Sequence, residues 1–108
     1  MTEPEADSFI DVATPIGFAV RCSHAWWDHI VSIKHPVMRQ REDLVVAALR
    51  HPVQVRRSRR DSAVYLFYAV EREGRWTCAV VRRENGSGFL ITAYPTDAIK
   101  EGDPVWPV

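Results

Sequence analysis

The stretch from residue 53 to residue 94 constrains the fold most strongly, because β-forming segments recur there between short polar turns. Val53 and Val55 alternate with polar residues, as in a half-buried strand. Aromatic and branched side chains dominate the later segments. Glu73-Gly74 and Asn85-Gly86 fit tight hairpin turns. Because short loops join antiparallel neighbours, we expect four antiparallel strands. They should lie at about 53–56, 63–71, 76–82 and 89–94.

Two helices are expected before these strands, and a His-Pro pair ends each of them. Ser23 is a suitable N-cap for a first helix over 24–34, which His35-Pro36 terminates. A second helix over 41–50 ends at His51-Pro52. Helical spacing predicts that the first helix buries Trp26, Ile30 and Ile33, and the second Leu44, Val45, Ala48 and Leu49. The expected fold class is therefore α+β, with two N-terminal helices packed on a four-stranded antiparallel twisted sheet.

The two ends of the chain are less regular. Residues 1–22 are expected to form an N-terminal arm or short strands, with an acidic lead-in over 1–7 that frays. Residues 23–108 are expected to form a single α+β domain. Residues 97–102 look like one helical turn closed by glycine, and Trp106 like a C-terminal anchor.

Composition narrows the class of protein. The 108 residues carry no formal net charge, but residues 21–83 hold thirteen basic and six acidic side chains. Most of the bases are arginines, so this excess is either a solvated surface or an anion-binding face. Cys22 and Cys78 lack zinc-site spacing, which favours buried thiols and predicts neither a metal nor another cofactor. Without a secretion signal or a long apolar run, we expect a cytoplasmic protein with no membrane contact.

Five residues carry the groups that a metal-free phosphodiester cleavage needs. They are His29, His35, Thr92, Tyr94 and Lys100. The two histidines lie six residues apart on the predicted first helix, and Thr92 and Tyr94 share one face of the last strand. Each also has a structural interpretation: packing for His29, a helix terminus for His35, strand surface for Thr92 and Tyr94, and solvation for Lys100.

A second set of residues could hold RNA phosphates or bases: Arg56, Arg57, Ser58, Arg60 and Tyr68. Guanidinium groups at a strand end would neutralise phosphates and make binding depend on salt. Tyr68 points to the opposite face from Tyr65 and Phe67, so its ring is either a base-stacking surface or part of the core. A solubilising loop is the alternative interpretation of the arginine cluster.

The order of these elements resembles the small barnase–EndoU–colicin–RelE-like nuclease superfamily, especially its phage- and toxin-associated branches. The resemblance spans residues 26–106. It rests on Trp27-Asp28-His29-Ile30, Lys34-His35-Pro36-Val37-Met38, His51-Pro52-Val53, Val55 with Ser58, Tyr65 to Tyr68, Ala79-Val80-Val81, Ile91-Thr92-Ala93-Tyr94, Ile99-Lys100 and Gly102.

The resemblance implies metal-independent endoribonuclease activity, with the RNA 2′-hydroxyl as the internal nucleophile. His29 or His35 would act as general base or acid, Thr92 and Tyr94 would hold the scissile phosphate, and Lys100 or Arg57 would stabilise its charge. RNA is the implied substrate, and an antitoxin or immunity protein is a possible partner. The alternative is a non-catalytic module on the same fold that binds RNA or protein. The sequence leaves the oligomeric state open.

Overall fold

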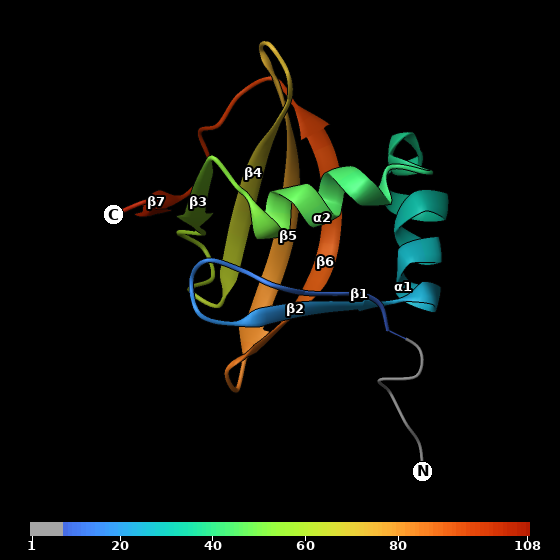
Figure 1. Ribbon diagram of the computed structural model, residues 1–108, viewed down its shortest axis with the longest axis horizontal. Helices are drawn as coiled ribbons and strands as arrows, with labels where there is room; N and C mark the ends of the chain where they lie inside the picture. Colours follow the sequence, from blue (N-terminus) through green and yellow to red (C-terminus); the bar gives the residue numbers. More distant parts are fainter. Residues whose placement is uncertain (1–7) are drawn as a thin grey trace.

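The computed structural model describes residues 8–108, which fold around one seven-stranded mixed sheet (Figure 1). The strands are β1 (Ser8–Ala13), β2 (Ala19–Ser23), β3 (Gln54–Arg57), β4 (Val64–Arg72), β5 (Arg75–Glu84), β6 (Ser87–Thr96) and β7 (Asp103–Trp106). Their order across the sheet is β1-β2-β6-β5-β4-β3-β7. Only β2 and β6 pair in parallel, and the other neighbours are antiparallel. The expectation for residues 1–7 falls outside the described residues.

The predicted fold class, with N-terminal helices on a four-stranded antiparallel sheet, is wrong. Strands β1 and β2 precede the helices and extend the sheet beyond β6, while β7 adds a strand beside β3. The β1–β2 hairpin belongs to the sheet because it alternates: Ile10, Val12, Val20 and Cys22 are buried, whereas the charged residues between them are exposed. Strand β7 is a short edge strand that contains a proline, a position where proline is tolerated.

The first helical segment is shorter and more irregular than expected. Helix α1 (His24–His29) begins at Ser23, whose Oγ accepts a hydrogen bond from the backbone N–H of Trp26 over 3.1 Å, as the N-cap prediction requires. It continues as a wider π-helical turn, η2 (Ile30–Lys34), in which the His35 N–H donates to the Ile30 carbonyl over 2.8 Å. A short 3₁₀ turn, η3 (Pro36–Met38), then leads to α2 (Glu42–Arg50). The widened turn sets the position of His35 at the end of the helix.

The predicted buried stripe of the first helix is confirmed at Ile30 and wrong at Trp26 and Ile33. Trp27, Ile30 and Val31 are buried, while Trp26 is 38% exposed and Ile33 is 69% exposed. A polar contact helps to fix this rotation, because the Trp27 indole N–H donates to the Glu42 carboxylate over 3.1 Å. In α2, Val45, Ala48 and Leu49 face the core as expected, and Leu44 is half-buried.

The main core lies between the sheet and its helices. Helix α2 crosses one face of the sheet, and α1 lies beyond the β6 side of the sheet (Figure 1). The opposite face, which we call the open face, carries a smaller apolar cluster of Leu66, Tyr68 and Cys78. No helix of the described chain covers it in Figure 1. Within residues 8–108, no helix has the length and apolar character that crossing a membrane requires.

Candidate functional site

A cleft of about 440 Å³ lies on the open face, and we call it the open-face cleft. Its lining residues are Ser58, Arg59, Arg60, Val64, Leu66, Val80, Tyr94, Lys100, Glu101 and Gly102. Apolar side chains from β4 and β5 form the floor, and charged side chains of two loops form the rim. A volume of this size falls in the range of small-ligand sites.

Tyr94 forms one wall of the cleft. It pairs with Cys78 across β5 and β6, and Val80 pairs with Thr92, so that Thr92 and Tyr94 share the open face as predicted. Burial, followed by the nearby Cys78 thiol, raises the pKa of Tyr94 far above its ordinary value. The thiol is itself buried, and burial raises the pKa of Cys78 to about 12. The Tyr94 hydroxyl therefore stays protonated at neutral pH and is hydrogen-bonded with the Cys78 thiol, so donation to a ligand requires that it turn away from the thiol.

His35 stands against Tyr94. Their ring centroids are 5.4 Å apart, and the planes are inclined by 43°. His35 is half-buried at the end of η2, so its imidazole is held beside the cleft wall. Of the five predicted catalytic residues, Tyr94 and Lys100 line the cleft, and His35 contacts the Tyr94 ring without being one of the lining residues.

His29 lies elsewhere. Its ring stacks on Trp26 with centroids 4.8 Å apart, and the Lys34 ammonium lies 5.3 Å from the same indole. The Trp26 indole N–H in turn donates to the Ile91 carbonyl over 3.0 Å. This bond binds α1 to β6 and explains why Trp26 stays at the surface instead of entering the core. His29 is therefore grouped with Trp26.

The segment after β6 holds Lys100 at the rim of the cleft. The predicted helical turn over 97–102 is wrong, because this segment is irregular in the structure. Arg56 fixes it in place: the guanidinium donates to the carbonyls of Glu101 and Gly102 over 2.7 and 2.8 Å, and to the Gln54 side chain over 2.6 Å. With its nitrogens so occupied, Arg56 is a structural residue and is not suited to grip a phosphate.

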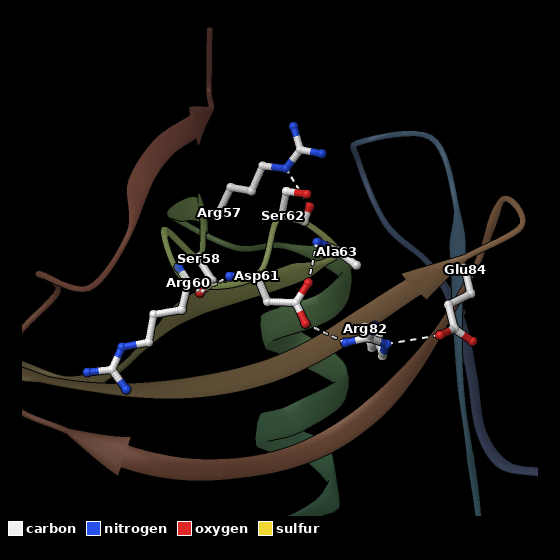
Figure 2. A network of polar contacts seen from close by, with 8 residues as sticks. All are labelled: Arg57, Ser58, Arg60, Asp61, Ser62, Ala63, Arg82 and Glu84. Carbon is white, nitrogen blue, oxygen red and sulfur yellow. Dashed lines mark hydrogen bonds and ion pairs between the residues drawn. The ribbon is translucent and has the colours of Figure 1, made fainter.

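A polar network shapes the 58–63 loop on the other side of the cleft (Figure 2). The Ser58 hydroxyl oxygen accepts the N–H groups of Arg60 and Asp61, so it organises the loop. Asp61 accepts the Ala63 N–H over 3.0 Å and pairs with Arg82 over 2.6 Å. The Ala63 N–H, followed by Arg82, lowers the pKa of Asp61.

The arginines of this loop do not form the single cationic face that the sequence suggested. Arg60 extends away from the network, and among the described residues its guanidinium has no hydrogen bond or ion pair (Figure 2). Arg59 also lines the cleft but is paired with Asp103 over 2.8 Å. Arg57 points to the other side, where it lies over the Tyr65 ring. Only Arg60 of the predicted arginines is therefore available in the cleft.

Tyr68 and the hydroxyl oxygen of Thr92 are sealed from solvent, although Thr92 as a whole is half-buried. Tyr68 is 2% exposed in the cluster beneath the 97–102 segment, so neither face of its ring can stack on a base. The Thr92 hydroxyl oxygen is buried and has no hydrogen-bond partner in the described chain. It lies near the register shift between β5 and β6, and because this oxygen is buried, a phosphate cannot reach it without local rearrangement.

Replacing Thr92 by valine is expected to raise the free energy of unfolding by about 1 kcal/mol, because a buried hydroxyl without a partner is removed at nearly constant shape. Chemical denaturation measures this change. Thr96→Val is the matched control, since the Thr96 hydroxyl donates to the Ala98 carbonyl and its loss should destabilise the fold. A fall in the stability of Thr92→Val would show that the hydroxyl is satisfied in solution.

A second hollow lies where β1, β2, β6 and α1 meet, and we call it the apolar groove. Its volume is about 390 Å³, and Trp26 and Phe89 line it together with Arg21. Phe89 is 43% exposed and pairs in register with Arg21 on one side and Arg82 on the other. Sequence reasoning missed both aromatic residues, because alternation and spacing alone do not show which aromatic side chains remain exposed.

No group of three or more histidine, cysteine or acidic side chains in residues 8–108 is placed to hold a metal ion. No family model, curated protein or solved structure matches the chain. The nuclease resemblance therefore stays a prediction.

Proposed function

We propose that the protein binds single-stranded RNA on the open face and cleaves it without a metal ion. The observation that carries this proposal is that Tyr94 and Lys100 line the open-face cleft while His35 packs against the Tyr94 ring. Arg60 adds a cationic group at the rim that can contact a phosphate. The exposed ring of Phe89 offers a stacking surface for a base.

The proposed reaction is an intramolecular transesterification, in which the neighbouring 2′-hydroxyl attacks the phosphorus of the scissile phosphodiester. The His35 imidazole takes the 2′-hydroxyl proton, since histidine is the side chain that exchanges protons near neutral pH. The 2′-oxygen bonds to phosphorus, and the bond from phosphorus to the 5′-oxygen breaks. Tyr94 donates a hydrogen bond to the phosphate, while Lys100 and Arg60 stabilise its developing charge. The departing 5′-oxygen takes a proton from Lys100 or from water, leaving a 2′,3′-cyclic phosphate.

A second candidate function is RNA binding without cleavage. Two observations favour it: of the two predicted histidines only His35 lies against the cleft wall, and the Tyr94 hydroxyl interacts with the Cys78 thiol. On this account the cleft holds RNA, and no proton transfer follows.

A protein inhibitor that covers the cleft would suit the first function, since unrestrained cleavage of RNA harms a cell.

Incubation of the purified protein with single-stranded RNA in EDTA tests the proposed function. Cleavage should persist, and the upstream fragments should end in 2′,3′-cyclic phosphate. Binding without cleavage over a range of salt and pH would support the second candidate function. An absence of both binding and cleavage at low salt would reject both candidates.

The double substitution Arg60→Ala with Lys100→Ala is expected to weaken RNA binding and to flatten its salt dependence. Loss of two phosphate contacts should reduce the slope of log K against log salt by about 1.4 for a single strand. Fluorescence anisotropy at several salt concentrations measures both effects. Arg50→Ala with Arg72→Ala removes the same charge from two exposed arginines outside the cleft. An equal loss in this control pair would reject the cleft as the binding site.

A further inference from the structure

A third hollow, of about 330 Å³, lies on the other face of the sheet and contains two arginines. Arg57 and Arg83 line it together with Tyr65 and Asn85, and no carboxylate of residues 8–108 is part of its lining. Arg57 pairs with Tyr65 in register, and Tyr65 belongs to the helix-side core, so this hollow is separate from the open-face cleft. We call it the two-arginine pocket.

Aromatic rings hold both guanidinium groups in place. Arg57 lies 5.3 Å from the centre of the Tyr65 ring, and Arg83 lies 4.6 Å from that of Phe18. The two rings contact each other with centroids 5.7 Å apart and planes inclined by 58°, so each arginine rests on one ring of the same aromatic pair. Stacking of this kind fixes a guanidinium while its N–H edge remains free to bind.

The remaining donors are available for a ligand. Arg57 uses its Nε–H on the Ser62 carbonyl, over 2.6 Å, which further fixes its direction (Figure 2). Within residues 8–108, neither guanidinium forms an ion pair, although Asp61 and Glu84 lie close in sequence. Those two acids are instead paired with Arg82. Arg82 thus engages both neighbouring carboxylates and offsets one of their two negative charges, and neither carboxylate is paired with Arg57 or Arg83.

We propose that the two-arginine pocket is a binding site for a phosphate group. Both guanidinium groups line one pocket, and guanidinium N–H groups can bind phosphate oxygens through paired hydrogen bonds. The Asn85 side chain lines the same pocket and can add a further polar contact. The phosphate can belong to a nucleic acid or be free in solution, because the chemistry of recognition is the same.

A titration with inorganic phosphate at constant ionic strength tests the site, with two-dimensional NMR spectra of the folded protein recorded at each step. The amide signals of Ser62, Ala63 and Gly86 should shift and saturate. Arg57→Ala with Arg83→Ala should weaken phosphate binding at least tenfold, and Arg57→Lys should weaken it less. Arg72→Ala, which removes one exposed arginine elsewhere, should leave it unchanged.

A 5′-phosphorylated RNA oligonucleotide, compared with the same oligonucleotide without that phosphate, distinguishes the two sources. Shifts with the RNA oligonucleotides but not with inorganic phosphate would assign the site to a phosphate of a nucleic acid. Shifts with inorganic phosphate would assign it to free phosphate. No saturable shift with either probe, or equal loss in Arg72→Ala, would overturn the proposal. The cleft variant Arg60→Ala with Lys100→Ala should still bind phosphate in the two-arginine pocket. Failure of the proposed function can therefore be distinguished from failure of the phosphate site.

Discussion

Replacing His35 by alanine should reduce RNA cleavage about 10² to 10⁴-fold, the usual contribution of a positioned acid or base. RNA binding should change little, because the cationic and stacking groups remain. His35 lies beside Tyr94 without belonging to the buried core, so the variant should fold. Single-turnover cleavage under saturating protein separates this loss of chemistry from any loss of binding.

Two other histidines supply controls for this experiment. His51 is exposed at the end of α2, and His51→Ala should cleave RNA as the unaltered protein does. His29→Ala should also retain cleavage, because His29 stacks on Trp26 and not on Tyr94. A larger loss in His29→Ala than in His35→Ala would contradict the assignment.

Tyr94→Phe should lower cleavage less than His35→Ala, since it removes one hydrogen bond to the phosphate.

Replacing Gly102 by alanine should lower the free energy of unfolding by about 3 kcal/mol. Gly102 has a φ of +78°, which costs an L-residue about 1–2 kcal/mol. An added Cβ would also lie 2.5 Å from the Arg57 carbonyl oxygen, which is closer than real Cβ contacts allow. The backbone must therefore shift where β7 approaches β3. Guanidinium denaturation followed by circular dichroism measures the change.

Gly74→Ala is the matched control, because it isolates the close approach from the backbone conformation. Gly74 has a similar φ of +75°, but an added Cβ would meet nothing within 4 Å. It should therefore cost only about 1 kcal/mol. Equal destabilisation by the two substitutions would show that the contact with Arg57 does not constrain the fold. Gly102→Ala should also weaken RNA binding, since the segment that it displaces carries Lys100.

The central strands could be predicted because their pattern is local. Turns at Glu73-Gly74 and Asn85-Gly86 separate β4, β5 and β6, and both glycines adopt the positive φ that such turns require. The His-Pro pairs likewise stand at the ends of the helical segments. These features depend on backbone chemistry that a few neighbouring residues decide.

The rest of the fold depends on distant partners. The β1–β2 hairpin becomes part of the sheet only through the parallel pairing of Val20 and Arg21 with β6, which no local pattern predicts. The burial of α1 differs from the expected helical stripe because a hydrogen bond to Ile91 holds Trp26 at the surface. The wider π-helical turn further alters the spacing of the side chains that follow.

The candidate site was predictable to a similar extent. The sequence indicated the shared face of Thr92 and Tyr94 and predicted His35 and Lys100 as their partners. In the structure His35 contacts the Tyr94 ring, and Lys100 lines the same cleft as Tyr94. It did not indicate that Arg56 would bind backbone carbonyls or that Arg57 would point to the opposite face. Neighbouring residues on a strand face opposite sides, so a run of arginines is divided between two surfaces.

The most direct test of the open-face site is an NMR titration with a 2′-O-methyl RNA oligonucleotide, which binds but cannot supply the 2′-hydroxyl. The account predicts saturable shifts of the His35, Tyr94 and Lys100 amide signals, with smaller shifts near Phe89. Saturable shifts confined to α2, or no shifts at low salt, would contradict it.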